Sequence, residues 1–139
     1  MRFMIIRRAD AQTEAGATPS EQLIEDMARY MDAMAQAGIL RGGDGLKPSA
    51  QGARVSFRQG TPTIMDGPFA EAKELIAGYT LIDVPSRDEA IAWLRRWPTS
   101  DGDGNVELEL RPLYELSDFG DGPGVKHHEE VRQRVGKYE

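Results

Sequence analysis

The leading candidate for chemistry in this sequence is Asp66, which stands directly before Gly67 and Pro68. An acidic residue followed by Gly-Pro is typical of a tight turn. Its carboxylate can accept hydrogen bonds from nearby backbone N–H groups and cap the turn, which is a structural role. Presented to a desolvated pocket, the same carboxylate can act as a general base. We take Asp66 as the candidate catalytic residue, and the turn-cap alternative stays open.

Further charged residues follow this turn closely. Glu71, Lys73 and Glu74 lie within one helical turn of each other, so they could position a polar ligand or form a solvated charged surface. Asp44, in the glycine-rich run 42–45, is another candidate for acid or base chemistry. We predict that Glu71, Lys73 and Asp44 contribute to substrate binding.

Two arginines are candidates for anchoring an anionic ligand. Arg54 and Arg111 each lie on a segment with strand-like alternation. A guanidinium group binds a carboxylate or phosphate through two parallel hydrogen bonds, which suits it to hold such a ligand. The alternative is structural ion pairing with Glu107 or Glu109, and the sequence does not decide between the two.

Several chemistries are excluded by composition. The chain has no cysteine, which removes thiolate nucleophiles, iron–sulfur clusters and disulfides, and its two histidines are His127 and His128 in the tail. The run Asp101-x-Asp103-x-Asn105 starts like a calcium loop, but Val106 and Pro112 occupy its sixth and twelfth positions. We therefore expect no metal and no cofactor.

Length and charge limit the partners. A chain of 139 residues corresponds to one domain on the usual scale of ~100–200 residues. Its net charge of −6 disfavours binding to DNA or to an anionic membrane surface, since both depend on Lys and Arg meeting phosphate. The longest early apolar run, residues 3–6, is too short for a signal peptide, and no stretch approaches the ~18 apolar residues that span a bilayer. We expect a cytoplasmic protein.

The elements that must position these residues alternate between strand and helix. Apolar residues at helical spacing predict a helix that Ser20 caps and Gly38 ends, and a second helix is expected between Ser86 and Pro98. Strands are expected at 2–7, 54–59, 63–65, 75–84 and 106–111, loops at 9–19 and 41–45, and a helical turn at 68–74. The order β-α-β-(β)-β-α-β predicts an α+β fold of the ferredoxin-like βαββαβ type, with both helices on one face of an antiparallel sheet.

The faces of these strands suggest a partner. We expect Val55 and Phe57 to point toward the helices, which leaves Arg54 on the opposite face with Glu107, Glu109 and Arg111. Strand 75–84 is apolar on both faces, and a strand of that kind is usually covered on both. Since the helices cover only one face, a second copy of the chain is the simplest cover for the other. We therefore predict a homodimer with a small-molecule cleft between the sheets.

A set of motifs then connects the sequence to a family. The run Asp66-Gly67-Pro68-Phe69 is followed by Glu71-x-Lys73-Glu74, by Gly78-Tyr79 in the next strand and by Glu109-Leu110-Arg111-Pro112-Leu113 in the last. Together they resemble the YCII-related, DGPF-domain family of small bacterial proteins. The resemblance covers roughly residues 1–120 and implies a ferredoxin-like protomer in a dimeric α/β barrel. We place the domain at 1–116 and a partly helical tail at 117–139.

The resemblance implies no settled activity. Some relatives occur beside or fused to alternative sigma factors, which suggests a transcription-related partner. The smaller relatives look as though they use a His–Asp pair, with the histidine on the first helix, and this chain has no histidine before residue 127. Three hypotheses follow. One is a small-molecule-binding protein that acts on a polar or anionic metabolite by cofactor-independent acid/base chemistry, of the isomerase or lyase kind. The alternative is a non-catalytic ligand-binding or interaction module in transcriptional regulation. The third is a structural dimer with no small-molecule site.

Overall fold

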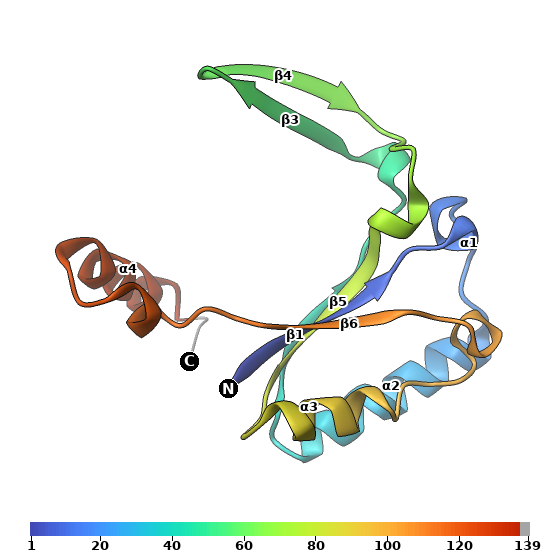
Figure 1. Ribbon diagram of the computed structural model, residues 1–139. Coiled ribbons are helices and arrows are strands. Elements are labelled where there is room, and N and C mark those ends of the chain that lie inside the picture. Colours follow the sequence, from blue (N-terminus) through green and yellow to red (C-terminus); the bar gives the residue numbers. More distant parts are fainter. Residues whose placement is uncertain (137–139) are drawn as a thin grey trace.

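The computed structural model describes residues 1–136, apart from the side chain of Lys73 (Figure 1). The strands are β1 (Arg2–Arg8), β2 (Leu40–Gly45), β3 (Ala53–Arg58), β4 (Thr61–Asp66), β5 (Ile76–Asp83) and β6 (Leu108–Pro112). The α-helices are α1 (Ala11–Glu14), α2 (Glu21–Gln36), α3 (Arg87–Leu94) and α4 (Pro123–Val135). Short 3₁₀ turns are η1 (Ser49–Gln51), η2 (Ala72–Glu74), η3 (Asp101–Gly104) and η4 (Leu116–Phe119).

The main sheet has the strand order β2-β5-β1-β6, and each neighbouring pair is antiparallel. Figure 1 shows α2 and α3 on one face of this sheet, and we call the other face the open face. Strands β3 and β4 form a separate antiparallel hairpin, the arm (residues 53–66), which rises at one end of the sheet. Helix α4 stands at the other end. The chain is thus a mixed α+β protein with antiparallel sheets.

The core lies between the main sheet and its two helices. Alternation along β1 turns Phe3 and Ile5 toward the helices, and these side chains are 1% and 0% exposed. Ile82 from β5 and Met34 from α2 pack against them in the same cluster, both fully buried. Burial of each such side chain stabilises the fold by about 1.5–3 kcal/mol, so this cluster holds the helices on the sheet.

Helix α2 begins and ends where the sequence predicts. The Ser20 hydroxyl oxygen accepts a hydrogen bond from the Leu23 backbone N–H at 3.1 Å, which satisfies one of the free donors of the first turn. Gly38, with φ of +76°, follows the last turn in the left-handed conformation that glycine adopts without strain.

Tyr30 joins the two helices. Its hydroxyl donates a 2.7 Å hydrogen bond to the Trp93 carbonyl oxygen, and its ring meets Trp93 and Trp97 edge to face at centroid distances of 6.3 and 5.5 Å. Burial raises the pKa of Tyr30 from 10.0 to about 12, because the phenolate would be poorly solvated there. The hydroxyl therefore stays protonated in the folded protein well above neutral pH.

The expected loop at 41–45 is wrong, since these residues belong to strand β2 at the edge of the main sheet. Low strand propensity of glycine suggested a loop, but the position requires it. A Cβ on Gly43 would lie 2.7 Å from the Tyr79 carbonyl oxygen, closer than real side chains come. Pairing with β5 therefore overrides local propensity.

The strand expected at 54–59 does form, as β3, but it lies in the arm and not in the main sheet. The prediction that Val55 and Phe57 point inward is wrong, because they are 52% and 69% exposed. Strand β2 occupies the edge position, next to β5, that we expected this segment to take in the main sheet. Alternation fixes which residues share a face, but it does not say what that face contacts.

Smaller differences concern element ends. The expected loop at 9–19 contains α1, which Asp10 and Thr13 start with a reciprocal capping box. The helical turn after Pro68 is confined to η2, α3 ends at Leu94 before Pro98, and β6 starts at Leu108. Each shift comes from capping or pairing that the spacing of apolar residues does not encode.

Tyr30→Phe should reduce the alkaline sensitivity of the fold. A group whose folded pKa is raised stabilises the protein fully below its unfolded pKa, and that contribution is lost as the pH rises through the folded value. Wild-type stability should therefore fall between pH 10.0 and about 12 by roughly 2–3 kcal/mol more than that of the variant. Urea unfolding at successive pH values measures this difference. Tyr114→Phe, at a 72% exposed position, is the control. An unchanged alkaline slope in Tyr30→Phe would contradict the assignment.

Candidate functional site

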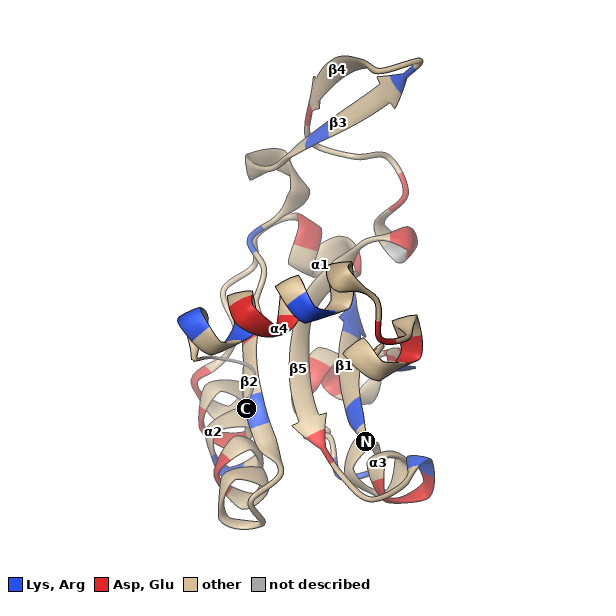
Figure 2. Ribbon diagram, turned by 90° about the vertical axis from the view of Figure 1, so that its left-hand side faces the viewer, with Lys and Arg blue, Asp and Glu red and all other residues tan. Residues whose placement is uncertain are grey.

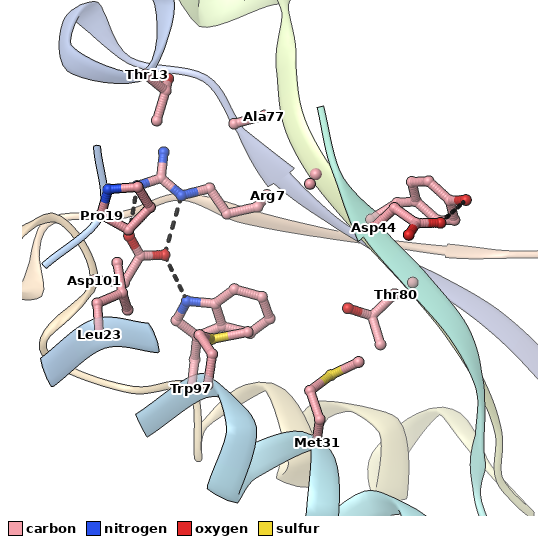
Figure 3. Close-up of a pocket in the computed structure, with 15 residues that line it drawn as sticks. Arg7, Thr13, Pro19, Leu23, Met31, Asp44, Ala77, Thr80, Trp97 and Asp101 are labelled. Atoms are coloured by element: carbon pink, nitrogen blue, oxygen red, sulfur yellow. Dashed lines mark hydrogen bonds and ion pairs between the residues drawn. The ribbon is translucent and has the colours of Figure 1, made fainter. Parts of the chain in front are cut away.

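A cavity of about 270 Å³ lies between α2 and the edge of the sheet formed by β2 and β5 (Figure 3). Apolar side chains at helical spacing on α2 form one wall, and glycine-rich backbone of the two strands forms the other. The wall residues are Leu23, Met27 and Met31 on α2, Gly43 and Gly45 on β2, and Ala77, Gly78 and Thr80 on β5. Unbranched methionines adapt to differently shaped ligands, so this wall suits a small apolar molecule.

Arg7, Asp101 and Trp97 close one end of the cavity. The Arg7 side chain leaves β1 toward the helices and meets the Asp101 carboxylate through two hydrogen bonds, Nε–Oδ2 at 3.1 Å and Nη2–Oδ1 at 2.7 Å. The Trp97 indole Nε1 donates to the same Oδ2 at 2.9 Å. Arg7 and Asp101 are 8% and 7% exposed, so a paired charge lies where the rest of β1 buries apolar side chains.

The Arg7 guanidinium is engaged on its other side as well. Its Nη1 donates to the Arg8 carbonyl oxygen at 2.7 Å and to Asp10 Oδ2 at 3.2 Å. The Asp101 hydrogen bond is the main cause that raises the pKa of Arg7, and the Thr13 backbone N–H is the main cause that lowers the pKa of Asp10. All three nitrogens of Arg7 thus hold protein groups. Arg7 organises the end of the cavity and is a poor anchor for an anionic ligand.

Asp44 and Tyr79 lie at the other side of the cavity. They are opposite each other on β2 and β5, and the Tyr79 hydroxyl donates to Asp44 Oδ2 at 2.9 Å. This hydrogen bond to a carboxylate raises the pKa of Tyr79, because it stabilises the protonated phenol. The pair combines a hydroxyl donor with a carboxylate that still has acceptor capacity for a ligand.

A second hollow, of about 610 Å³, lies on the open face and meets the first at this pair. Gly43, Asp44 and Tyr79 line both cavities. Met4 and Leu81 form the apolar floor of the second hollow, and its other lining residues are Arg2, Leu40, Arg41, Gly42, Ile82 and Leu113. Along β5, alternation directs the Tyr79 side chain to the open face, so a ligand in the second hollow would meet the Tyr79 hydroxyl and the Asp44 carboxylate bonded to it.

The candidate catalytic residue Asp66 ends β4 at the base of the arm and is exposed. It does not line either of these cavities. The residues after it form a joint with η1: the Gly67 N–H donates to the Gly52 carbonyl at 3.0 Å, and the Phe69 N–H donates to Ser49 Oγ at 3.0 Å. A Cβ on Gly67 would lie 1.7 Å from the Ser49 carbonyl oxygen, so the joint requires glycine at this place.

Glu14 ties the same joint to α1. Its carboxylate accepts from the Ser49 N–H at 3.0 Å and from the Ser49 hydroxyl at 2.5 Å, and the hydroxyl bond is the main cause that lowers the pKa of Glu14. Arg54, a candidate anion anchor, lies over the Phe69 ring with its guanidinium carbon 3.9 Å from the ring centroid. The structure thus brings Arg54 and Asp66 to the base of the arm, where the contacts observed are structural.

The other candidate residues lie apart from this joint. Arg111 is on the open face, where its Nη1 donates to Glu109 Oε2 at 3.3 Å, and Glu109 also pairs with Arg8 at 2.8 Å. The ion pair with Glu109, one of the two alternatives for Arg111, is therefore present. Glu71 is exposed before η2, and the Lys73 side chain lies outside the described residues. Of the candidates, Asp44 alone lines these two cavities.

Sequence patterns did not single out four residues that line the site: Arg7, Asp101, Trp97 and Tyr79. A signal existed for Arg7, because it shares the inward face of β1 with Phe3 and Ile5. A charged residue at an inward position needs a buried partner, although spacing does not reveal that the partner comes 94 residues later.

Within the described part of the chain, no group of three or more His, Asp or Glu side chains is placed to hold a metal ion. Nor does any of its helices combine the length and apolar character needed to cross a membrane.

Asp101→Asn should destabilise the fold strongly. It removes the charge that compensates Arg7 while keeping nearly the same shape, and breaking a buried pair in this way costs about 3–5 kcal/mol. Urea unfolding at neutral pH measures the loss. Glu25→Gln serves as a control, because its pair with Arg29 at 3.1 Å is exposed and should matter little. Equal stabilities for the two variants would rule out the role assigned to the buried pair.

Gly67→Ala should open the joint beneath the arm. The added methyl group cannot fit against the Ser49 carbonyl, so the turn must move and the fold should lose about 2 kcal/mol or more. Thermal unfolding and trypsin cleavage after Arg54 and Arg58 measure the loss and the loosening. Gly52→Ala is the matched control in the same joint, with an ordinary 3.5 Å contact. If both variants behave alike, the close approach at Gly67 does not hold the arm.

Comparisons with known proteins place this geometry in context. A curated relative, an uncharacterised protein of Rhizobium meliloti (strain 1021), is 33% identical over 93 residues, which are 67% of this chain and 74% of the relative. Among solved structures, the 5-chloro-2-hydroxyhydroquinone dehydrochlorinase of Burkholderia phenoliruptrix AC1100, in complex with 2,5-dihydroxybenzoquinone, matches with 13% identity and a TM-score of 0.41. The match covers 87% of this chain and all of that one. The model of the YCII-related domain matches residues 1–113, and the chain therefore belongs to the YCII-related domain family.

Proposed function

We propose that this protein binds a small molecule at a site centred on Asp44 and Tyr79. The observation that carries the proposal is the hydrogen bond between these two side chains at the boundary of two cavities. Ligand sites are mostly apolar hollows with a few convergent polar groups, and this arrangement fits that description. The first cavity, at about 270 Å³, is slightly smaller than the ~300–1,000 Å³ usual for such sites.

The lining of the first cavity favours a compact, mostly apolar ligand that carries a hydroxyl or amine group. Its walls are methionine, leucine and strand backbone, and the guanidinium at its closed end is held by Asp101 and Asp10. Asp44 lies at the boundary with the open-face hollow, where its carboxylate accepts hydrogen bonds and repels anions. This ligand class differs from the polar or anionic metabolite that the sequence suggested.

The same pair could perform cofactor-independent acid/base chemistry. The Asp44 carboxylate would take a proton from a carbon or oxygen of the ligand, and the Tyr79 hydroxyl, released from Asp44 as that carboxylate is neutralised, would turn and donate to the negative charge that forms. Return of the proton from Asp44 to a different atom of the ligand would give an isomer.

A second copy of the chain would complete the site from the open face. The half-buried Met4, Ile6, Tyr79 and Leu81 form an apolar strip on that face, flanked by the Arg8–Glu109–Arg111 ion pairs. We propose a ferredoxin-like protomer, which the strand order β2-β5-β1-β6 supports, in a dimer that covers this strip. Such a dimer, in the cytoplasm, is also the setting in which Arg111 or Arg54 could anchor an anionic ligand.

Asp44→Asn should weaken binding without unfolding the protein. Trp97 lines the first cavity, so Trp93→Phe gives a background in which it is the one remaining tryptophan and reports on ligand entry. A panel of small neutral ring compounds with hydroxyl groups, each matched with a carboxylate analogue, would be titrated by fluorescence and by thermal shift. For hydroxyl compounds we expect Asp44→Asn to raise Kd about tenfold, the loss of one hydrogen bond to a charged acceptor, and Tyr79→Phe to raise it less.

Asp66→Asn tests the other candidate base in the same assay. It should leave both affinity and any turnover unchanged if Asp44 is the functional carboxylate. Loss of turnover in Asp66→Asn, with Asp44→Asn unaffected, would reverse the assignment. Selective binding of the carboxylate analogues, lost in Arg111→Gln or Arg54→Gln, would instead support an anionic ligand at the dimer face.

A further inference from the structure

The arm has one apolar face that no other part of the chain covers within residues 1–136. Residues paired directly across an antiparallel ladder point to the same side, so the pairs Val55–Ile64 and Phe57–Pro62 share one face. The exposed fractions of Val55, Phe57 and Ile64 are 52%, 69% and 71%. The opposite face is mostly polar, with Arg54, Ser56, Arg58, Thr61, Thr63 and one apolar residue, Met65.

An arm of this composition needs a contact partner to be stable in water. A two-stranded hairpin alone is marginal, and exposed apolar surface of this kind usually marks an interaction site. Each residue of β3 and β4 is exposed, and the arm is held at its base by the joint with η1. The division into one face that is apolar except for Asp66 at its base and one mostly polar face indicates that a specific surface packs against the first.

The tail of the same chain offers a complementary surface. Tyr114 and Phe119 are 72% and 60% exposed. Their ring centroids are 4.8 Å apart, so the two rings form an aromatic pair at η4. Segment 115–130 around them carries five carboxylates against one lysine, Lys126. Segment 53–65 of the arm carries Arg54 and Arg58 and no acidic residue, and Figure 2 shows these blue positions on β3 and at its tip. The two segments are thus opposite in charge, which favours their approach, although Arg54 and Arg58 lie on the polar face of the arm; the face that would pack offers apolar surface to the aromatic pair.

Within one chain the two surfaces do not meet. Figures 1 and 2 agree that the arm rises well away from η4 and α4, and Figure 1 shows the two at opposite ends of the sheet, flanking the open face. Consider a second copy placed over the open face by a two-fold axis that runs perpendicular to the plane of Figure 1. Its tail would then lie at the first copy's arm. The same rotation would bring its arm to the first copy's tail, so the contact is made twice and closes.

We propose that the apolar face of the arm packs on the Tyr114–Phe119 pair of a second copy, and that the two copies exchange arms in this way. The proposal adds a second contact region to the sheet-to-sheet dimer put forward under Proposed function, and it can fail while that dimer persists. Each copy would then hold the other at three places: the open face and two arm–tail contacts.

Cross-linking tests the contact directly, because the natural chain has no cysteine. Ser56→Cys is on the polar face of the arm and Ser117→Cys is in η4; both serines are exposed, so neither change disturbs the proposed contact. The two variants would be co-expressed with different tags, purified through both tags and treated with a short bis-maleimide. We expect a covalent dimer from the mixed pair and none from either variant alone. A covalent dimer of Ser56→Cys with itself indicates an arm-to-arm contact and overturns the proposal.

Sedimentation measures what the contact contributes. The double variant Phe57→Ser, Ile64→Thr should raise the dimer dissociation constant about tenfold or more, because large apolar groups at the centre of an interface dominate its affinity. Met65→Thr, on the opposite face of the same hairpin, is the matched control and should leave the constant nearly unchanged. Because both positions are exposed, circular dichroism should remain that of the natural protein.

The two proposals fail in different ways. A dimer that keeps its affinity in the double variant and gives no mixed cross-link overturns the arm–tail contact alone. A natural chain that is monomeric at micromolar concentration overturns the contact and the sheet-to-sheet dimer together, whereas ligand binding at Asp44 would be judged separately by the Trp97 titration.

Discussion

The buried ion pair of Arg7 and Asp101 is the constraint on which the site depends. It joins the end of β1 to η3, a segment 94 residues later, and it gives Trp97 a hydrogen-bond acceptor inside the protein. A buried charge pair contributes little net stability compared with apolar packing. Removal of either partner, however, strongly destabilises the fold, because the other charge is left buried and uncompensated. Its value here is positional, since it fixes the closed end of the cavity and ties α1 to the sheet through Asp10.

The cavity exists because side chains are missing where strands β2 and β5 meet. Gly43 and Gly78 allow the two backbones to approach closely, and no side chain from them fills the space above α2. The same glycines weaken β2 as a strand, and its pairing with β5 offsets this. The site is thus formed on strands of low local propensity, and Asp44 is carried to its boundary on the glycine-rich β2.

The turn that carries the family resemblance has a mechanical role in this structure. Gly67 and Phe69 clasp η1, Glu14 holds the clasp to α1, and Arg54 lies on the Phe69 ring. These contacts fix where the arm leaves the domain. The most recognisable motif of the chain therefore determines the direction of the arm, and the polar pair at the cavity rim comes from a less conspicuous stretch.

Elements with local signals can be predicted from the amino-acid sequence alone. Ser20 and Gly38 delimit α2, apolar runs mark β1 and β5, alternation marks β6, and the DGPF run identifies the family. Asp44 was also found in this way, as a candidate for acid/base chemistry in a glycine-rich run. Only the tertiary structure decided that 40–45 is a strand, that Val55 and Phe57 face away from the core, and that Arg7 meets Asp101. The physical reason is that pairing partners and cavity walls come from distant segments, whereas periodicity and capping report only on neighbours within a few residues.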